Sequence, residues 1–156
     1  MVRDLRADRL TETELDGGAN VRVIAGQAAG GRLTGPVEGL AVAPKLVDVT
    51  LPPGTAFRET VPRGHTAFAY VDHGDLRFGP ERTPVHGPAL VVFGDGDVVE
   101  ASAGAGGGRF LLAAARPLHE PISRYGPFVM NTRAEIEQTL EDLRTGHFIR
   151  DEPRDE

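Results

Sequence analysis

Five histidines are the side chains of this sequence that could bind a transition metal or move a proton near neutral pH, because the chain has no cysteine. One of them, His65, follows a Pro-Arg-Gly turn and precedes a predicted strand, so its imidazole could point into the fold. The others fall in predicted turns, in proline-rich loops or just beyond a helix, where bonding to backbone or solvent is expected: His73, His86, His119 and His147. His65 is therefore the remote candidate for a metal ligand.

Nucleophilic and carboxylate chemistry has little support in the residue spacing. There is no Gly-x-Ser-x-Gly motif, and Ser102 and Ser123 are the only serines. Asp95, Asp97 and Glu100 could serve acid–base catalysis or hold calcium, but a solvated turn explains this cluster better. Residues 104–108 are glycine-rich, yet no Lys-Ser or Lys-Thr follows them as in a phosphate-binding loop. We therefore predict no catalytic residue and no cofactor.

Short apolar stretches, separated by Gly and Pro turns, must form the framework. Their alternation of apolar and polar residues predicts antiparallel strands without helical crossovers, as in a jelly-roll sandwich or barrel. We interpret 72–75 as a hairpin turn and 104–108 as a loop between two strands. The continuous apolar run 89–93 is expected to be buried on both faces. The predicted strands are residues 21–25, 45–51, 67–71, 75–78, 89–93, 97–102 and 109–114.

One helix is predicted, at about residues 132–145. Thr132 and Glu135 have the spacing of a capping box at its start, and Gly146 is suited to end it. Between them, Ile136, Leu140 and Leu143 form one apolar stripe. The helix is therefore expected to pack through that stripe.

A rigid aromatic loop leads into this helix: Pro121, Tyr125, Gly126, Pro127, Phe128 and Met130. The stretch 116–148 closely resembles the C-terminal end of the pirin family, which are two-domain proteins of the cupin superfamily, and the preceding residues also fit the second pirin domain. The resemblance implies a mainly β chain: a single cupin-type antiparallel jelly-roll β-sandwich or barrel with one C-terminal α-helix. The expected divisions are an N-terminal arm at 1–16, the cupin domain at 17–149 and a frayed tail at 150–156.

Cupins hold their metal with three His and one Glu from two motifs, G-x5-H-x-H-x3,4-E-x6-G and G-x5-P-x-G-x2-H-x3-N. This chain keeps framework glycines of both motifs: Gly54, Gly74, Gly79 and Gly87. The ligand positions are occupied by residues that cannot jointly hold a transition metal: Thr60, Pro62, Ala67 (or Thr66 with the shorter spacing) and Leu90. We therefore expect a metal-free domain, and the resemblance implies the same, since pirins carry their metal in the N-terminal domain.

The composition narrows the classes of partner. The chain of 156 residues has a net charge of −6 and a single lysine, so its surface should repel phosphate backbones. No apolar run approaches the length of a bilayer span, and the charged N-terminus lacks the apolar core of a signal peptide. We expect a cytoplasmic protein that binds neither nucleic acid nor membrane directly.

The resemblance leaves three functions open. The first is a non-catalytic module for domain or subunit interaction, which forms a homodimer or binds a pirin N-terminal-like cupin domain through Tyr125, Phe128 and Met130. Such a chain would be a fragment of a two-domain protein or a naturally short one. The second is part of a metal-dependent, quercetin dioxygenase-like oxidoreductase, assembled with a metal-bearing partner. The third is a small-molecule binder that uses an apolar barrel, with a cavity beneath Phe68, Tyr70 and Leu90.

Overall fold

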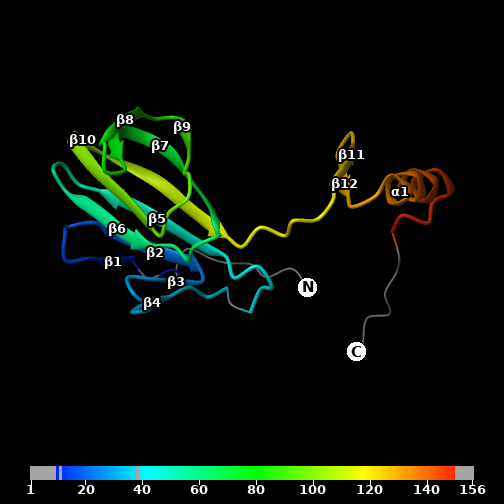
Figure 1. The fold of residues 1–156 in the computed structure, drawn as a ribbon, viewed down its shortest axis with the longest axis horizontal. Coiled ribbons are helices and arrows are strands. Elements are labelled where there is room, and N and C mark those ends of the chain that lie inside the picture. Colours follow the sequence, from blue (N-terminus) through cyan, green and yellow to red (C-terminus); the bar gives the residue numbers. More distant parts are fainter. Residues whose placement is uncertain (1–9, 11, 38, 150–156) are drawn as a thin grey trace. The chain divides into compact units, whose positions relative to one another are not determined.

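The computed structural model describes residues 10, 12–37 and 39–149, which divide at Pro117 into two compact units (Figure 1). The strands of the first unit are β1 (Glu12–Glu14), β2 (Asn20–Ala25), β3 (Gln27–Ala28), β4 (Leu33–Thr34), β5 (Lys45–Leu51), β6 (Ala56–Thr60), β7 (Thr66–Phe78), β8 (Thr83–His86), β9 (Ala89–Val92) and β10 (Val98–Ala115). The second unit contains β11 (Ser123–Tyr125), β12 (Phe128–Met130) and α1 (Arg133–Thr145). No helix in this described part of the chain is long and apolar enough to cross a membrane.

The large sheet of the first unit is folded over on itself. Its strands are antiparallel in the order β1-β2-β5-β10-β7-β8, with β6 also paired to β10 and β9 to β7. The beginning of β10 pairs with β6 and the end of β7, whereas its end pairs with β5 and the beginning of β7. The two halves therefore form the layers of a β-sandwich, which confirms the predicted fold class.

Aromatic rings join the two layers across the core. The fully buried ring of Phe110, in the second half of β10, lies 5.7 Å from Phe57 on β6 and 5.3 Å from Phe78 at the end of β7, both edge-on. Such edge-to-face contacts add to the stabilisation from apolar burial. Smaller apolar side chains fill the remaining space, among them Val47, Val49, Ala69, Val71, Leu76 and Leu112.

Glycines form the corner at which β7 and β10 pass from one layer to the other. Gly74 has a φ of +94°, and a Cβ at this position would lie 2.3 Å from the carbonyl oxygen of Gly107, so the close approach of the two backbones requires glycine. The register between the strands shifts from Ala103 to Gly108, as in a β-bulge. The predicted hairpin turn at 72–75 and the predicted loop at 104–108 are therefore wrong, since both segments are bends within continuous strands.

The face of β7 and β9 that points away from the core carries large apolar side chains. Phe68 is paired with Val92 and Tyr70 with Leu90 across the two strands. The exposed fractions are 40% for Phe68, 45% for Tyr70, 61% for Leu90 and 68% for Val92. We call these four residues the outer apolar face. The prediction that 89–93 is buried on both faces is wrong, because among the described strands β9 pairs only with β7 and covers the core through alternate residues.

Short strands complete the first unit at its N-terminal side. β1 pairs with β2 at the sheet edge, and β3 forms a small hairpin with β4. β1 belongs to the segment that the sequence predicts as an arm, although residues 1–9 and 11 of that arm lie outside the described residues. The predicted tail at 150–156 also lies outside them.

The second unit is a β-hairpin followed by the predicted helix. β11 and β12 turn at Gly126 and Pro127, and Phe128 packs edge-on against Phe148 with ring centroids 5.9 Å apart. The capping box is present, since Thr132 accepts from the Glu135 amide and Glu135 accepts from the Thr132 amide. Of the predicted stripe, Ile136 is buried, Leu140 is half-buried and Leu143 is exposed.

Candidate functional site

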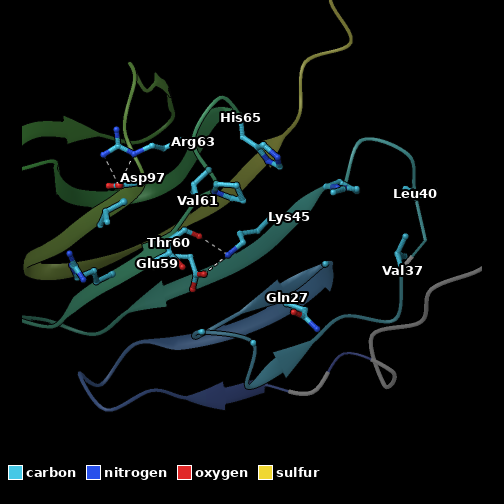
Figure 2. A pocket seen from close by; sticks show the side chains of 18 of the residues that line it. Gln27, Val37, Leu40, Lys45, Glu59, Thr60, Val61, Arg63, His65 and Asp97 are labelled. Carbon is cyan, nitrogen blue, oxygen red and sulfur yellow. Dashed lines mark hydrogen bonds and ion pairs between the residues drawn. The ribbon is translucent and has the colours of Figure 1, made fainter.

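A large cleft opens at the seam where the sandwich is not closed. In the described part of the chain, β6 pairs with β10 along one edge, and its other edge faces the β3–β4 hairpin and the segment that leads to β5. The cleft between them has a volume of about 1110 Å³ (Figure 2). Its size suits a small molecule.

A buried ion pair lies at the floor of this cleft. The side chains of Glu59 and Lys45 are 1% and 13% exposed, and the Lys45 ammonium donates a hydrogen bond to Glu59 Oε1. Lys45 Nζ also donates to the Thr60 carbonyl oxygen at 2.8 Å, and the Ala29 amide donates to Glu59 Oε2 at 2.9 Å. Each carboxylate oxygen therefore has a partner, and β5, β6 and the β3–β4 turn are tied together at one point.

The strand geometry explains why Glu59 points inward. Along β6 the buried residues alternate with exposed ones, so Glu59 shares the inward face with Phe57 and, just beyond the strand, Val61. A carboxylate on this face is stable only with a charged partner and full hydrogen bonding. Lys45, the first residue of β5, is placed to provide both.

His65 lines the cleft and carries an unpaired polar atom that is shielded from solvent. A tight turn positions it, in which the His65 amide donates to the Pro62 carbonyl oxygen at 3.1 Å. Its Nδ1 is buried and has no hydrogen-bond partner among the described residues. A buried polar atom without a hydrogen bond lowers the stability of the fold unless a partner binds to it.

The rim of the cleft carries two exposed ion pairs. Arg63 donates to Asp97 at 3.0 Å, and Arg58 donates to Glu100 at 3.0 Å. Two of the carboxylates that the sequence places in a possible acid–base cluster are thus each paired with an arginine from the β6 side. The charges of Arg63 and Asp97 therefore cancel at the rim, whereas the partner of Arg58 lies outside the cleft lining.

The cupin ligand positions do not converge on one point. Thr60 and Pro62 line the cleft, Ala67 is buried on the inner face of β7, and Leu90 belongs to the outer apolar face on β9. Pro62, Ala67 and Leu90 have no side-chain donor atom, and Leu90 faces away from the core. These four residues do not fit a transition-metal site.

His65 also lacks partners for metal binding. Apart from positions 11 and 38, residues 10–149 hold no group of three or more His, Asp or Glu side chains placed to bind a metal ion. His73 is bonded to Asp72 and His86 to Asp75, all four with exposed side chains, at the corner of β7 and on β8. The structure thus brings His65 together with Lys45 and Glu59 and not with other histidines.

The outer apolar face is the second surface of functional interest. On β10 next to it lie the half-buried Leu111, opposite Tyr70, and Ala113, opposite Phe68. Beyond Leu111, Asp48 accepts two hydrogen bonds from Arg109, at 2.8 and 2.7 Å. This bonding raises the pKa of Arg109, chiefly through the side-chain hydrogen bonds and then through the charge of Asp48. An apolar centre with a fixed polar pair at its border is the pattern of a protein interface.

The predicted interface residues of the second unit differ in exposure. Tyr125 is largely exposed, while Phe128 and Met130 are half-buried. Phe128 is engaged with Phe148 inside the unit. Tyr125 is therefore the member of this set with most surface available to a partner.

Sequence reasoning missed the Lys45–Glu59 pair, although a signal was present. Lys45 is the only lysine of the chain and opens a strand, and Glu59 stands where alternation with Phe57 and Val61 requires an inward residue. The pair joins residues of two different strands, so neither position alone identifies it.

Three comparisons relate the chain to known proteins. Residues 46–149 match the family described as the pirin C-terminal cupin domain. The chain is 40% identical over 150 residues to a Pseudomonas aeruginosa protein whose name assigns it provisionally to the quercetin 2,3-dioxygenases, covering 92% of this chain and 51% of that protein. It is 33% identical over 146 residues to pirin of Homo sapiens, covering 91% of this chain and 49% of that protein.

The fold agrees with these matches. A crystal structure of quercetin 2,3-dioxygenase from Acinetobacter baumannii superposes with a TM-score of 0.81 and 29% identity, covering 92% of this chain and 49% of that one. The chain spans about half the length of the curated relatives it matches.

Proposed function

Because this chain belongs to the pirin family and contains its C-terminal cupin domain, we propose that it is a non-catalytic module that packs against a second cupin domain of the pirin N-terminal kind. The partner domain would carry the metal, whether it is joined to this chain or separate. This chain would supply a rigid surface that orients it.

The outer apolar face is the observation that carries the proposal. Phe68, Tyr70, Leu90 and Val92 form two adjacent cross-strand pairs whose side chains are 40–68% exposed. A contiguous apolar surface of this kind is typical of an interaction site. The relatives are about twice as long as this chain, so a second domain is available in them to cover it.

Binding to an isolated partner domain tests the proposal. We would purify the N-terminal half of the Homo sapiens relative, which is the half that this chain does not cover. Isothermal titration calorimetry would then measure the affinity of this chain for that half. Replacing Leu90 by Ser and Val92 by Thr together should weaken binding by about tenfold or more, because each buried CH2 removed costs about 0.8 kcal/mol and a tenfold loss of affinity corresponds to about 1.4 kcal/mol.

A matched control uses another exposed leucine. Leu40 lies in the seam cleft and is exposed to a degree similar to Leu90, so Leu40→Ser should leave the affinity unchanged. Light scattering on the chain alone tests for a homodimer. If the chain forms a stable dimer that Leu90→Ser/Val92→Thr dissociates, the outer apolar face binds a second copy of the chain in place of the partner domain. No binding to the N-terminal half, with the chain a monomer, would contradict the proposal.

A catalytic assembly is the second candidate, because two of the similar proteins carry the name of quercetin 2,3-dioxygenase. The proposal predicts that the chain alone, loaded with Fe²⁺, Mn²⁺, Ni²⁺ or Cu²⁺, consumes no oxygen with quercetin in an oxygen-electrode assay. Turnover by the chain alone that a chelator stops and that His65→Ala abolishes would overturn the non-catalytic role. Turnover only in the complex would support a catalytic assembly in which this chain is the orienting half.

A further inference from the structure

We propose that the seam cleft binds a small, largely apolar and uncharged molecule that presents a carbonyl oxygen to the ammonium of Lys45. The site lies between β6 and the β3–β4 hairpin, and it involves none of the outer apolar face.

The ammonium has a donor left for such a ligand. Lys45 Nζ carries three N–H groups, and two of them are directed to Glu59 Oε1 and the Thr60 carbonyl oxygen. Within the described part of the chain the third N–H has no acceptor, and Lys45 lines the cleft (Figure 2). A ligand oxygen placed there would receive a charge-assisted hydrogen bond.

His65 supplies a second polar point on the same cleft. Its buried Nδ1 is unpaired among the described residues, and a neutral imidazole nitrogen can donate or accept according to its tautomer. Because Nδ1 is shielded from solvent, a ligand hydroxyl or a second carbonyl would satisfy it once the ring turns toward the cleft. A purely structural role for the Lys45–Glu59 pair explains the tie between strands, but explains neither this atom nor the open volume of about 1110 Å³.

The ion pairs of the cleft disfavour a strongly ionic ligand. Glu59 neutralises Lys45 at the floor and Asp97 neutralises Arg63 at the rim, while Arg58 is paired with Glu100, which lies outside the cleft lining. A bound anion would therefore meet the carboxylates of Glu59 and Asp97 beside cations that are already paired, whereas a neutral oxygen gives up less hydration on entering the cleft.

Apolar side chains form much of the remaining wall. Val37 and Leu40 stand on the segment before β5, and Val61 follows β6 on the opposite side (Figure 2). Pro62, the next residue after Val61, also lines the cleft. Pockets that are mostly apolar with a few convergent polar groups are the usual form of small-molecule sites. Burying the apolar part of the ligand would provide most of the affinity, and Lys45 would select the oxygen.

Two probes that differ in one carbonyl group test the inference. We would titrate the 15N-labelled chain with 4-hydroxyacetophenone and, separately, with 4-ethylphenol, and follow the backbone amide resonances. The ketone should shift amides of the cleft, including those of Gly39, Thr60 and His65, and should bind about tenfold more tightly than the phenol, as expected for a hydrogen bond to a charged donor.

A double variant separates the effect of the Lys45 hydrogen bond on ligand preference from the effect of the shape of the cleft. Lys45→Met/Glu59→Leu replaces the ion pair by apolar side chains, a change that buried pairs often tolerate. It should reduce the tenfold preference for the ketone to less than twofold while the phenol still binds, and Leu90→Ser on the outer apolar face should change neither affinity. Should the double variant fail to fold, His65→Phe replaces it, with weaker ketone binding expected.

Three outcomes would overturn the inference. One is that neither probe shifts cleft amides at millimolar concentration. Another is equal affinity for both probes in the wild-type chain. The third is an unchanged preference for the ketone in the folded double variant. None of these outcomes depends on the partner domain, so the proposed function and this inference can fail separately.

Discussion

At the scale of single residues, Glu59 and Lys45 decide how the open seam is held. Their pair is buried in a region where β6 has no neighbouring strand on one edge among the described residues. A buried carboxylate without its cation is strongly unfavourable, because desolvation is then not compensated. The pair thus fixes the width of the cleft as well as its charge.

Removing one member of the pair should be more harmful than removing both. We expect Glu59→Gln to lower the free energy of unfolding by about 3 kcal/mol, since it leaves the Lys45 ammonium buried without a counter-charge. Urea denaturation followed by circular dichroism measures the change. Lys45→Met/Glu59→Leu should lose less than Glu59→Gln, and the reverse order would show that the pair is not buried as the structure describes.

A second prediction at this scale concerns the corner glycine. Gly74→Ala should destabilise the chain by about 3 kcal/mol or more, because the new Cβ would meet the backbone of Gly107 and Gly108 and the residue must keep a positive φ. Gly79→Ala is the matched control: its φ of +71° is also positive, but a Cβ there meets nothing within 4 Å. It should lose only about 1 kcal/mol, and equal losses would contradict the close approach of the strands.

At the scale of elements, the sequence indicates the regular strands and hides the bent ones. β2, β5 and α1 follow from alternation and capping signals and lie where these signals predict them. For each of β7 and β10 the sequence predicts two strands and not one, because glycines beside polar residues are typical of turns as well as of bulges. The bend depends on contact between two strands distant in sequence, which no local pattern contains.

β9 and the cleft were mispredicted or missed for a related reason. An apolar run such as 89–93 is typical of a strand buried on both faces, but its exposure depends on which strands pair with it, and within residues 39–149 and the other described segments β9 pairs with β7 alone. The residues at 60, 62, 67 and 90 were identified as unable to bind metal from their types alone. Their separation, and the cleft that Thr60 and Pro62 line, required the fold.

The capped helix gives a pH-dependent prediction at the element scale. Hydrogen bonds from the Thr132 hydroxyl and, next, from backbone amides lower the pKa of Glu135 below its ordinary value of 4.5. The lowered pKa means that the carboxylate stabilises the folded helix fully above about pH 4.5, and that this contribution is lost as pH falls through the folded pKa.

NMR secondary shifts of residues 136–139 measure this effect. Between about pH 6 and about pH 3 they should move toward coil values in the wild-type chain. Glu135→Gln should start closer to the coil values and change little with pH. Glu137→Gln removes a carboxylate from the same helix that pairs with Arg133 and takes no part in the capping box, and it should retain the wild-type pH response. A flat response in the wild-type chain would show that the capping box does not stabilise the helix.

At the scale of the whole molecule, the described residues divide into two units with separate interiors. The buried core cluster consists of residues between Ala19 and Ala114, while the second unit is organised around Ile136 and the Phe128–Phe148 contact. The predicted relation to the pirin C-terminal domain is confirmed over residues 46–149, which cover part of the first unit and most of the second.

The division predicts that the sandwich is stable without the second unit. A chain that ends at Pro117 should give dispersed amide resonances and a single cooperative urea transition, because it retains every residue of the core cluster. A chain ending at Leu112 is the comparison, since it lacks the buried Ala114 and the last pairs of β10 with β5 and β7. It should unfold at a lower urea concentration. Loss of folded structure on removal of 118–156 alone would contradict the independence of the sandwich.

The corner at Gly74, Gly107 and Gly108 also determines how the sandwich can open. β7 and β10 each run through both layers, so separating one layer from the other breaks main-chain ladders that the two layers share. The layers therefore belong to one cooperative opening unit, and not to two. In native-state hydrogen exchange, the amide protons of Phe110 and Leu112 in one layer should be released by the same global event as those of Leu76 and Val99 in the other.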